Sequence, residues 1–503
     1  DPTFSTRNGY TIIDGRDTNP GLITANVIVS VDRFIFQYGS SIGNGGGVHN
    51  GGVLTLTNSI VRYNTADYDG GGISNRGTLF LENVLIHDNS GWSGGGIYNY
   101  GSFVEVRNSG IYNNSAYQGG GIKGGGIIHI YNSTISGNEG YEYGGGIENY
   151  SGTYTLNNVT ISNNKSEYGG GIYNYSSNVN SVLIQNTMLG GNTASKGGPD
   201  CGNNLTQGSV KSVGNSLIST TAGCRYTSGT GDLVNVNPLL GTFLPNRGYH
   251  PLQAGSPAIN AGASCYGTTD QRGVARIDAC DIGSYEYTTP GAAAFIEIVS
   301  GDLQRTAPNF SFTKPFGVAV LDDNGSPVSE QSITFQAPGS GPSGTFTNGS
   351  NQYGPILTDA GGLAASTTFT ANSESGEYLV TAVAGFGSVD FHLSNVAFYV
   401  DPAGSDANDC QSVPTACATI QGAVDKARKG DAVMVAEGTY DDTGDQVVNL
   451  TKSLNFYGGW DATFSTQSGY SSINGNGLRS GIIVEAGATV RMQRFVITRS
   501  WND

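Results

Sequence analysis

Six glycine triplets recur at a nearly constant interval along the first part of the chain, and no other sequence feature constrains the fold as strongly. Successive triplets begin 25, 24, 25, 25 and 25 residues apart. Such a period indicates a repeat architecture in which each unit buries its apolar face only by stacking on its neighbours. The triplets begin at Gly45, Gly70, Gly94, Gly119, Gly144 and Gly169.

Within each unit the apolar residues alternate with a period of two, as in Leu54/Leu56 and Leu79/Leu81. This period is typical of strands, and glycine and asparagine between the strands tolerate the backbone of sharp corners. Parallel strands joined by crossovers wind right-handed. The sequence therefore predicts an all-β chain built on a right-handed parallel β-helix with about 25 residues per coil.

Each unit also carries two asparagines six positions apart, and we expect both columns to stack as ladders of side-chain amides. The first column is Asn58, Asn83, Asn108, Asn132, Asn158 and Asn186, and the second is Asn64, Asn89, Asn114, Asn138, Asn164 and Asn192.

The six cysteines form three couples that are close in sequence: Cys201 with Cys224, Cys265 with Cys280, and Cys410 with Cys417. No histidine stands near them at the spacing of a zinc site. Three local disulfides in an oxidising, extracellular compartment are predicted, with six reduced thiols in the cytosol as the alternative.

After Leu189 the period degrades. The segments 255–262, 269–276 and 280–287, together with the Gly-Gly-Gly-Ile-Tyr-Asn coils, resemble bacterial surface β-helix proteins of the polymorphic outer-membrane and pectin-lyase-like type. The resemblance implies that residues 1–290 form one β-helix, opened in mid-coil at its start.

Residues 291–395 lose the triplets and show about seven short strand patterns, which suggests a sandwich. Segments such as 318–328 and 358–364 resemble bacterial Ig-like domains of the invasin and intimin type. In that family such modules are spacers.

Residues 396–503 begin another solenoid. The segments 399–406, 418–424 and 437–440 resemble the opening of extracellular β-helix proteins. Ile420, Ala423, Val424 and Ala427 share one face of a helix expected over about 415–428, which would cap the solenoid's open end.

Residues 461–470 match residues 1–10 at seven of ten positions, an offset of 460. We interpret the chain as about one period of a tandem array. The alternative is one protein with two related solenoids.

The net charge of −16 and the lack of a basic cluster argue against a nucleic acid partner, and no apolar run is long enough to insert into a membrane. Lyases of this fold need an acidic calcium site beside a basic residue. The outward positions after the triplets show no such cluster, and we expect no catalysis; they are His49, Ser74, Tyr98, Lys123, Glu148 and Tyr173.

Two binding sites remain open. Tyr98, Tyr100, Tyr150, Tyr173 and Tyr175 either stack on sugar rings or stack on one another from coil to coil. Asp401, Asp406 and Asp409 either hold Ca²⁺ or form ordinary turns, and no other cofactor or metal is expected.

These patterns favour a structural or adhesive protein of a bacterial cell surface, part of a fibre, stalk or adhesin. Its expected partners are further copies of itself, in tandem or end to end, with glycans or host surfaces as additional targets. A polysaccharide-binding or polysaccharide-cleaving β-helix is the alternative.

Overall fold

The computed structural model describes residues 10–499 apart from 102, 177–180, 205–208, 278, 429, 442–445, 486–487 and 489. The protein is all-β, with 49% strand and 2% helix. Its contacts divide the chain into two compact units. The first is Asp1–Gly291 with the turn Asn324–Ser326, and the second is Ala292–Asp323 with Pro327–Asp503.

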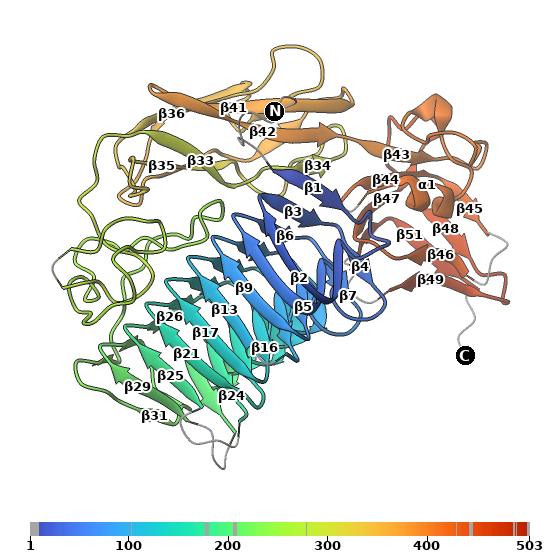
Figure 1. Ribbon diagram of the computed structural model, residues 1–503. Coiled ribbons are helices and arrows are strands. Elements are labelled where there is room, and N and C mark those ends of the chain that lie inside the picture. The colour runs from blue at the N-terminus through green and yellow to red at the C-terminus, as the bar shows by residue number, and fades with distance from the viewer. Residues whose placement is uncertain are drawn as a thin grey trace. The chain divides into compact units, whose positions relative to one another are not determined.

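The first unit is a parallel β-solenoid, as the sequence predicts, and its strands stack in regular succession in Figure 1. Strands one coil apart in sequence pair in parallel, so each sheet runs along the solenoid rather than around it.

Three sheets make up its walls. The ten-stranded sheet contains β1 (Thr11–Asp14), β3 (Phe34–Gln37), β6 (Ile60–Arg62), β10 (Leu85–His87), β14 (Gly110–Tyr112), β18 (Thr134–Ser136), β22 (Thr160–Ser162), β26 (Met188–Gly190), β30 (Leu217–Ile218) and β32 (Leu233–Val234). The seven-stranded sheet contains β4 (Ser40–Ser41), β7 (Thr65–Ala66), β11 (Ser90–Ser93), β15 (Ser115–Gln118), β19 (Glu139–Tyr143), β23 (Lys165–Tyr168) and β27 (Thr193–Gly197). The fifteen-stranded sheet contains β2 (Leu22–Asp32), β5 (Val48–Thr57), β8 (Ile73–Asn75), β9 (Thr78–Glu82), β12 (Ile97–Asn99), β13 (Phe103–Arg107), β16 (Ile122–Gly124), β17 (Ile127–Tyr131), β20 (Ile147–Asn149), β21 (Thr153–Asn157), β24 (Ile172–Asn174), β25 (Val182–Gln185), β28 (Cys201–Asn203), β29 (Val210–Gly214) and β31 (Tyr226–Thr227).

The core consists of equivalent apolar residues stacked coil on coil. Ile97 pairs in register with Ile73 on one side and with Ile122 on the other, and all three are fully buried. Ile86, Ile111 and neighbouring residues form a second such column. The core therefore depends on stacking, because no single coil could enclose its own apolar side chains.

The second unit contains two differently built regions. Residues 295–395 form mostly antiparallel sheets around a phenylalanine-rich core that includes Phe316, Phe335, Phe369 and Phe391. The strands there are β33 (Phe295–Ser300), β34 (Gln304–Thr306), β35 (Gly317–Leu321), β36 (Ser332–Gln336), β37 (Gly344–Phe346), β38 (Gln352–Leu357), β39 (Leu363–Ala365), β40 (Phe369–Ala371), β41 (Gly376–Ala384) and β42 (Gly387–Asn395).

From residue 397 the pairing becomes parallel again, in three small sheets. The strands are β43 (Ala397–Val400), β44 (Ala432–Ala436), β45 (Gly438–Tyr440), β46 (Gln446–Leu450), β47 (Leu454–Trp460), β48 (Ser471–Asn474), β49 (Ser480–Val484), β50 (Val490–Gln493) and β51 (Phe495–Thr498).

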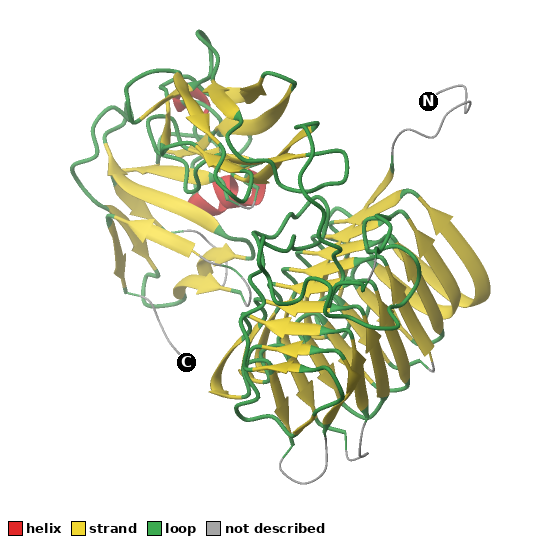
Figure 2. Cartoon of the chain, turned by 90° about the vertical axis from the view of Figure 1, so that its left-hand side faces the viewer, coloured by secondary structure: helices red, strands yellow, loops and turns green. Residues whose placement is uncertain are grey.

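The helix predicted over about 415–428 is shorter than expected. Helix α1 covers Ile420–Lys426, preceded by a 3-10 turn at Val413–Thr415, and these are the helices coloured red in Figure 2. Thr419 ends the extended segment, and its side chain accepts the N–H of Gly422 as the helix cap. The buried face holds Ile420, Ala423 and Val424.

The last coil of the second unit repeats the first coil of the first unit. Strand β48 pairs with β51 in the same register as β1 with β3, so Ser471 lies opposite Phe495 as Thr11 lies opposite Phe34. Residues 1–9, which enter the match with 461–470, lie outside the described residues. The equivalence of the two coils therefore rests on the residues from Thr11 and from Ser471 onward.

Backbone hydrogen bonds correspond one by one at offsets of 460 and 461. Thr11 N donates to Arg33 O over 3.0 Å, and Ser471 N donates to Arg494 O over 3.0 Å. The two arginines share a left-handed backbone, with φ of 61° and 57°. Further equivalent bonds are Gly15 N to Gln37 O (2.9 Å) with Gly475 N to Thr498 O (3.0 Å), and Asp17 N to Tyr38 O (2.7 Å) with Gly477 N to Arg499 O (2.7 Å).

Candidate functional site

One of the two asparagine columns forms a continuous ladder inside the solenoid. Each Nδ2 donates to the Oδ1 of the next asparagine along the axis over 2.9 to 3.0 Å. The other N–H of Asn114 donates to Ile86 O, and Asn114 Oδ1 also accepts the main-chain N–H of Asn89. The ladder residues are Asn64, Asn89, Asn114, Asn138, Asn164 and Asn192, at most 6% exposed.

This ladder ends in a carboxylate. Asn192 Nδ2 donates to Asp200 Oδ1 over 2.9 Å, and the other carboxylate oxygen accepts from Ser219 Oγ and Thr220 N. Asp200 is fully buried. A carboxylate accepts without donating, so it satisfies the last amide and requires no further rung.

The other asparagine column differs from the prediction, because its residues form the corners of the coils. All six have a left-handed backbone, with φ between 43° and 54°. Asparagine tolerates this conformation better than other residues with a side chain. Only Asn83 donates to another member of the column, Asn58, over 3.3 Å. The column is Asn58, Asn83, Asn108, Asn132, Asn158 and Asn186.

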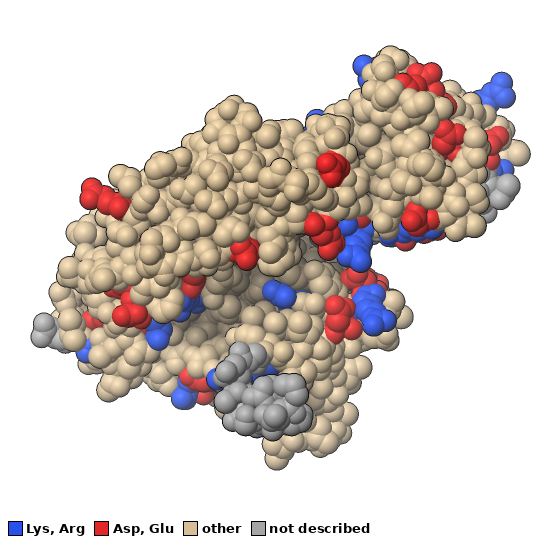
Figure 3. Space-filling view, turned by 90° about the horizontal axis from the view of Figure 1, so that it is seen from above, with Lys and Arg blue, Asp and Glu red and all other residues tan. Residues whose placement is uncertain are grey.

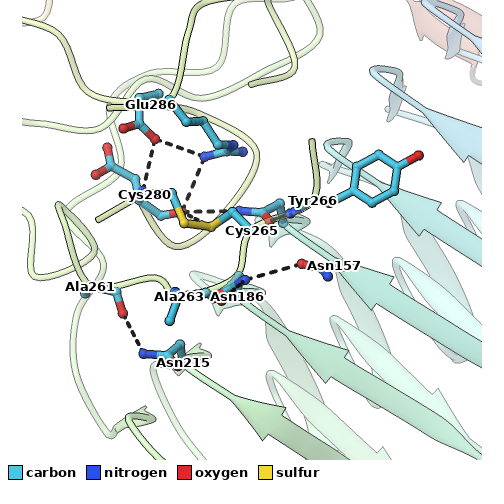
Figure 4. Close-up of a disulfide and its surroundings, with 12 residues drawn as sticks. Asn157, Asn186, Asn215, Ala261, Ala263, Cys265, Tyr266, Cys280 and Glu286 are labelled. Atoms are coloured by element: carbon cyan, nitrogen blue, oxygen red, sulfur yellow. Dashed lines mark hydrogen bonds and ion pairs between the residues drawn. A yellow bond between two sulfur atoms is a disulfide. The ribbon is translucent and has the colours of Figure 1, made fainter. Parts of the chain in front are cut away.

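The later corner asparagines bind residues 238–287, which we call the return segment. This segment runs back along the solenoid, since Asn215, Asn186 and Asn132 donate in turn to Ala261 O, Ala263 O and Thr269 O. Figure 4 shows the first two of these contacts. The three distances are 3.0, 2.9 and 2.9 Å.

Asn158 is the most heavily used corner. Its Oδ1 accepts Tyr266 N over 2.8 Å, and its Nδ2 lies 3.2 Å from both Gly283 O and Cys265 Sγ. The corner amides therefore hold a segment whose described residues form no regular strand.

The three predicted disulfides are confirmed, and none of the six cysteines is free. The bond between Cys265 and Cys280 joins two parts of the return segment beside the asparagine corners, as Figure 4 shows. It closes a loop with a sequence separation of 15 residues. The other bonds join Cys201 to Cys224 and Cys410 to Cys417.

Two buried ion pairs brace the same segment. Arg272 pairs with Asp270 over 2.8 Å, and Arg276 pairs with Glu286 over 3.0 Å. The side chains of both pairs are at most 5% exposed. Removing one partner would leave a buried charge uncompensated, so these pairs fix the conformation of the segment.

A third amide column, two positions after the apolar residue that follows each triplet, also stacks. Asn50 Nδ2 donates to Asn75 Oδ1 over 2.6 Å, and Asn75 Nδ2 to Asn99 Oδ1 over 2.7 Å. Gly124 interrupts this column, and the buried Tyr154 hydroxyl donates to its carbonyl over 3.2 Å.

The expectation that no acid and base meet at the outward positions is wrong. Lys123 Nζ lies 3.4 Å from Glu148 Oε2, and their side chains are 7% and 2% exposed. Both lie against the triplet bend, where a Cβ on Gly119 would come within 2.4 Å of the Lys123 Cβ. Burial raises the pKa of Glu148 to about 7, although Lys123 opposes the shift.

The tyrosines proposed for sugar stacking mostly stack on one another. The rings of Tyr150 and Tyr175 lie 5.7 Å apart at 8°, and Tyr173 lies 4.6 Å from Tyr143 at 25°. Tyr98 and Tyr100 lie 4.3 Å apart. Tyr150 and Tyr173 thus each stack on a tyrosine about one coil away, so stacking between coils accounts for their spacing better than a sugar strip does, whereas Tyr98 and Tyr100 belong to one coil and are tilted at 48°.

The acidic residues 401, 406 and 409 do not converge. Asp401 accepts Ala403 N, and Asp409 accepts Gln411 N, each two residues ahead. Asp406 accepts the N–H groups of Ala418 and Thr419. Within the described residues no three His, Cys, Asp or Glu side chains are grouped to hold a metal ion. Asp401 and Asp409 stabilise local turns, whereas Asp406 binds the backbone just before helix α1.

Charged side chains on the face shown in Figure 3 are scattered, and basic residues lie among acidic ones. In the described part of the chain, no helix has the length and apolar character needed to cross a membrane. No protein-family model, curated protein or solved structure matches this chain.

Proposed function

We propose that this protein is a structural module of an extracellular bacterial fibre, stalk or adhesin, repeated in tandem with a period of about 460 residues. The observation that carries the proposal is the coil at 471–499, which repeats the backbone hydrogen bonds of 11–38 one by one. A repeated coil at this distance is expected where one module is followed by another.

In this proposal each module has three parts. Residues 396–460 cap a β-helix, the equivalent of 1–290 forms its coils, and 291–395 is an Ig-like spacer of the invasin and intimin type. The buried face of α1, packed with Phe398, Val400 and Val433, supports the role of a cap. The antiparallel sheets around Phe316 support the spacer.

The mechanical character of the module follows from its ladders. Backbone pairing between coils, buried amides and disulfides resist local opening, which is what a stiff and protease-resistant rod requires. The three disulfides also support an oxidising, extracellular location. The proposed partners are further copies of the module, with glycans or host surfaces at the adhesive part of the assembly.

The register at the junction follows from the equivalent coils. Leu454 lies opposite Val490 and Phe456 opposite Met492. At an offset of 461, Val490 and Met492 correspond to Val29 and Val31. The strand equivalent to β47 in a preceding module would therefore lie opposite Val29 and Val31. The first coil leaves large apolar side chains exposed, among them Ile12, Ile23 and Ile28 at 55, 64 and 85%. A preceding cap would cover this edge.

Imaging the native assembly by electron microscopy, with a denaturing gel of the same material, tests the proposal. We expect rods with a regular axial repeat and a polypeptide far larger than 52.2 kDa. If the rods dissociate in denaturant into chains of this mass, the assembly consists of docked subunits and not of a covalent array. A dispersed monomer would contradict both.

Catalysis is not part of the proposal. A polysaccharide lyase needs a base that substrate can reach, whereas Lys123 and Glu148 are covered. A panel of polysaccharides incubated with the protein should show no cleavage, and release of unsaturated or reducing ends would favour the alternative function.

A further inference from the structure

An aromatic column on the seven-stranded sheet ends at Tyr141 with one ring face uncovered. Trp92 and Tyr117 stack at 4.8 Å and 16°, and Tyr117 and Tyr141 stack at 5.4 Å and 21°. Tyr117 thus has a ring on either side. The next strand carries Ser166 and Glu167 at this level, and Tyr141 is 64% exposed.

Strand β19, which carries Tyr141, has one residue more than its neighbours. Gly140 lies opposite Ala116, whereas Tyr143 lies opposite Gln118, and the register shifts between them. A second shift occurs toward β23, where Glu139 and Tyr143 lie opposite Lys165 and Tyr168. Bulges of this kind redirect side chains and are frequent beside functional sites.

Tyr141 lines a surface depression of about 430 Å³. Residues without bulky side chains, Gly140, Ser166 and Ala194, are among those that line it. Its volume lies within the range of small-molecule sites, about 300–1,000 Å³.

Two ion pairs hold polar atoms around the depression. Glu139 pairs with Lys165 over 2.8 Å, and Glu167 pairs with Lys196 over 2.6 Å. Glu139, Lys165 and Glu167 line it. A flat aromatic face beside solvent-exposed carboxylate and ammonium groups suits a ring with an apolar face and equatorial hydroxyls.

We propose that Tyr141 is the platform of a binding site for a neutral pyranose ring of a glycan. The ring's C–H face would lie on Tyr141, and its hydroxyls would donate to Glu139 or Glu167 and accept from Lys165. The net charge of −16 disfavours acidic polysaccharides. The site does not depend on the tandem arrangement. Its platform is not one of the tyrosines proposed from the sequence, which are Tyr98, Tyr100, Tyr150, Tyr173 and Tyr175.

Titrating the full chain with cellohexaose, mannohexaose and xylohexaose, and with an oligogalacturonate of equal length, tests this site. We expect weak binding of at least one neutral probe by calorimetry or ligand-observed NMR, and weaker binding of the acidic one. Tyr141→Ala should raise the Kd at least tenfold, and Tyr141→Phe should change it less than threefold because the ring face remains.

Tyr68→Ala is the matched control, because Tyr68 is similarly exposed, at 61%, and does not line the depression. Circular dichroism would establish that each variant keeps its strand content. The proposal is overturned if no neutral probe binds, if Tyr141→Ala binds as the unchanged chain does, or if Tyr68→Ala loses as much affinity.

Discussion

The two asparagine columns of the solenoid have the same residue, the same period and neighbouring positions, yet the fold uses them in opposite ways. Asn114 points inward, where its amide bonds to equivalents above and below. Asn158 turns a corner with φ of 54° and binds the return segment. The backbone at each position, rather than the residue type, decides which partners an amide reaches.

The largest expected effect comes from breaking the inner ladder. Asn114→Leu would leave Asn89 without the acceptor for both its side-chain and main-chain N–H groups, each at about 1–3 kcal/mol. We expect a loss of roughly 4 kcal/mol in the free energy of unfolding, measured by urea denaturation. A loss below 1 kcal/mol would contradict the ladder's role.

The second-largest expected effect comes from removing the disulfide that holds the return segment. Replacing Cys265 and Cys280 together with alanine removes a crosslink over a 15-residue separation, which is worth about 3 kcal/mol. Hydrogen exchange should quicken in residues 244–287 and stay slow in β14 and β18. Uniform loss of protection would instead mean that the segment and the coils unfold together.

A matched pair of corner substitutions separates backbone conformation from side-chain bonding. Glycine keeps the left-handed corner, so Asn158→Gly removes only the bonds to the return segment and should cost about 1–2 kcal/mol. Asn83→Gly should change stability by less than about 0.5 kcal/mol, since its bond to Asn58 is exposed. Equal losses in thermal unfolding would show that the corner itself, and not the segment, matters.

The smallest effect is the contribution of His250, in the return segment, to the pH dependence of stability. Burial lowers the pKa of His250 to about 4, and its ring bonds to Ser136 Oγ and Gly241 O. The neutral form is thus favoured by folding, so its stabilisation is complete above pH 6.5 and lost as the pH falls toward 4.

When the pH is lowered from 7.5 to 5.5, the free energy of unfolding of His250→Gln should therefore fall by about 1 kcal/mol less than that of the unchanged chain. The pKa of Glu148 is raised to about 7 and that of Asp281 to about 6, mainly by burial, so both act with the opposite sign. Both groups are present in either chain, and the comparison cancels them. An equal or larger pH-dependent loss in the variant would contradict the assignment.

The sequence predicted much of the solenoid because stacking translates a period directly into contacts. The register of 25 residues places Ile73, Ile97 and Ile122 in one column without further information. The same reasoning was sufficient for Lys123 and Glu148, which are one period apart. Taken singly, the outward positions do not indicate this pair, because the two residues become neighbours only when their coils stack.

The return segment was beyond such reasoning, since it has lost the period and its partners on the coils lie far away in sequence, 46 residues for Asn215 and Ala261 and 77 for Asn186 and Ala263. Nothing in the composition distinguishes a corner asparagine from a ladder asparagine. The sign of φ does so, and it emerges only when the coil closes.

The carboxylate of Asp200 gives the inner ladder a direction. Every amide passes its hydrogen bond the same way along the axis, and the sequence of donors stops only at a group that has no proton to offer. Coils could be inserted or deleted upstream without disturbing this terminus, because each new asparagine receives from one neighbour and gives to the next. The hydrogen bonding of the ladder thus sets no limit on the number of coils, but it does require an acceptor such as Asp200 at the end.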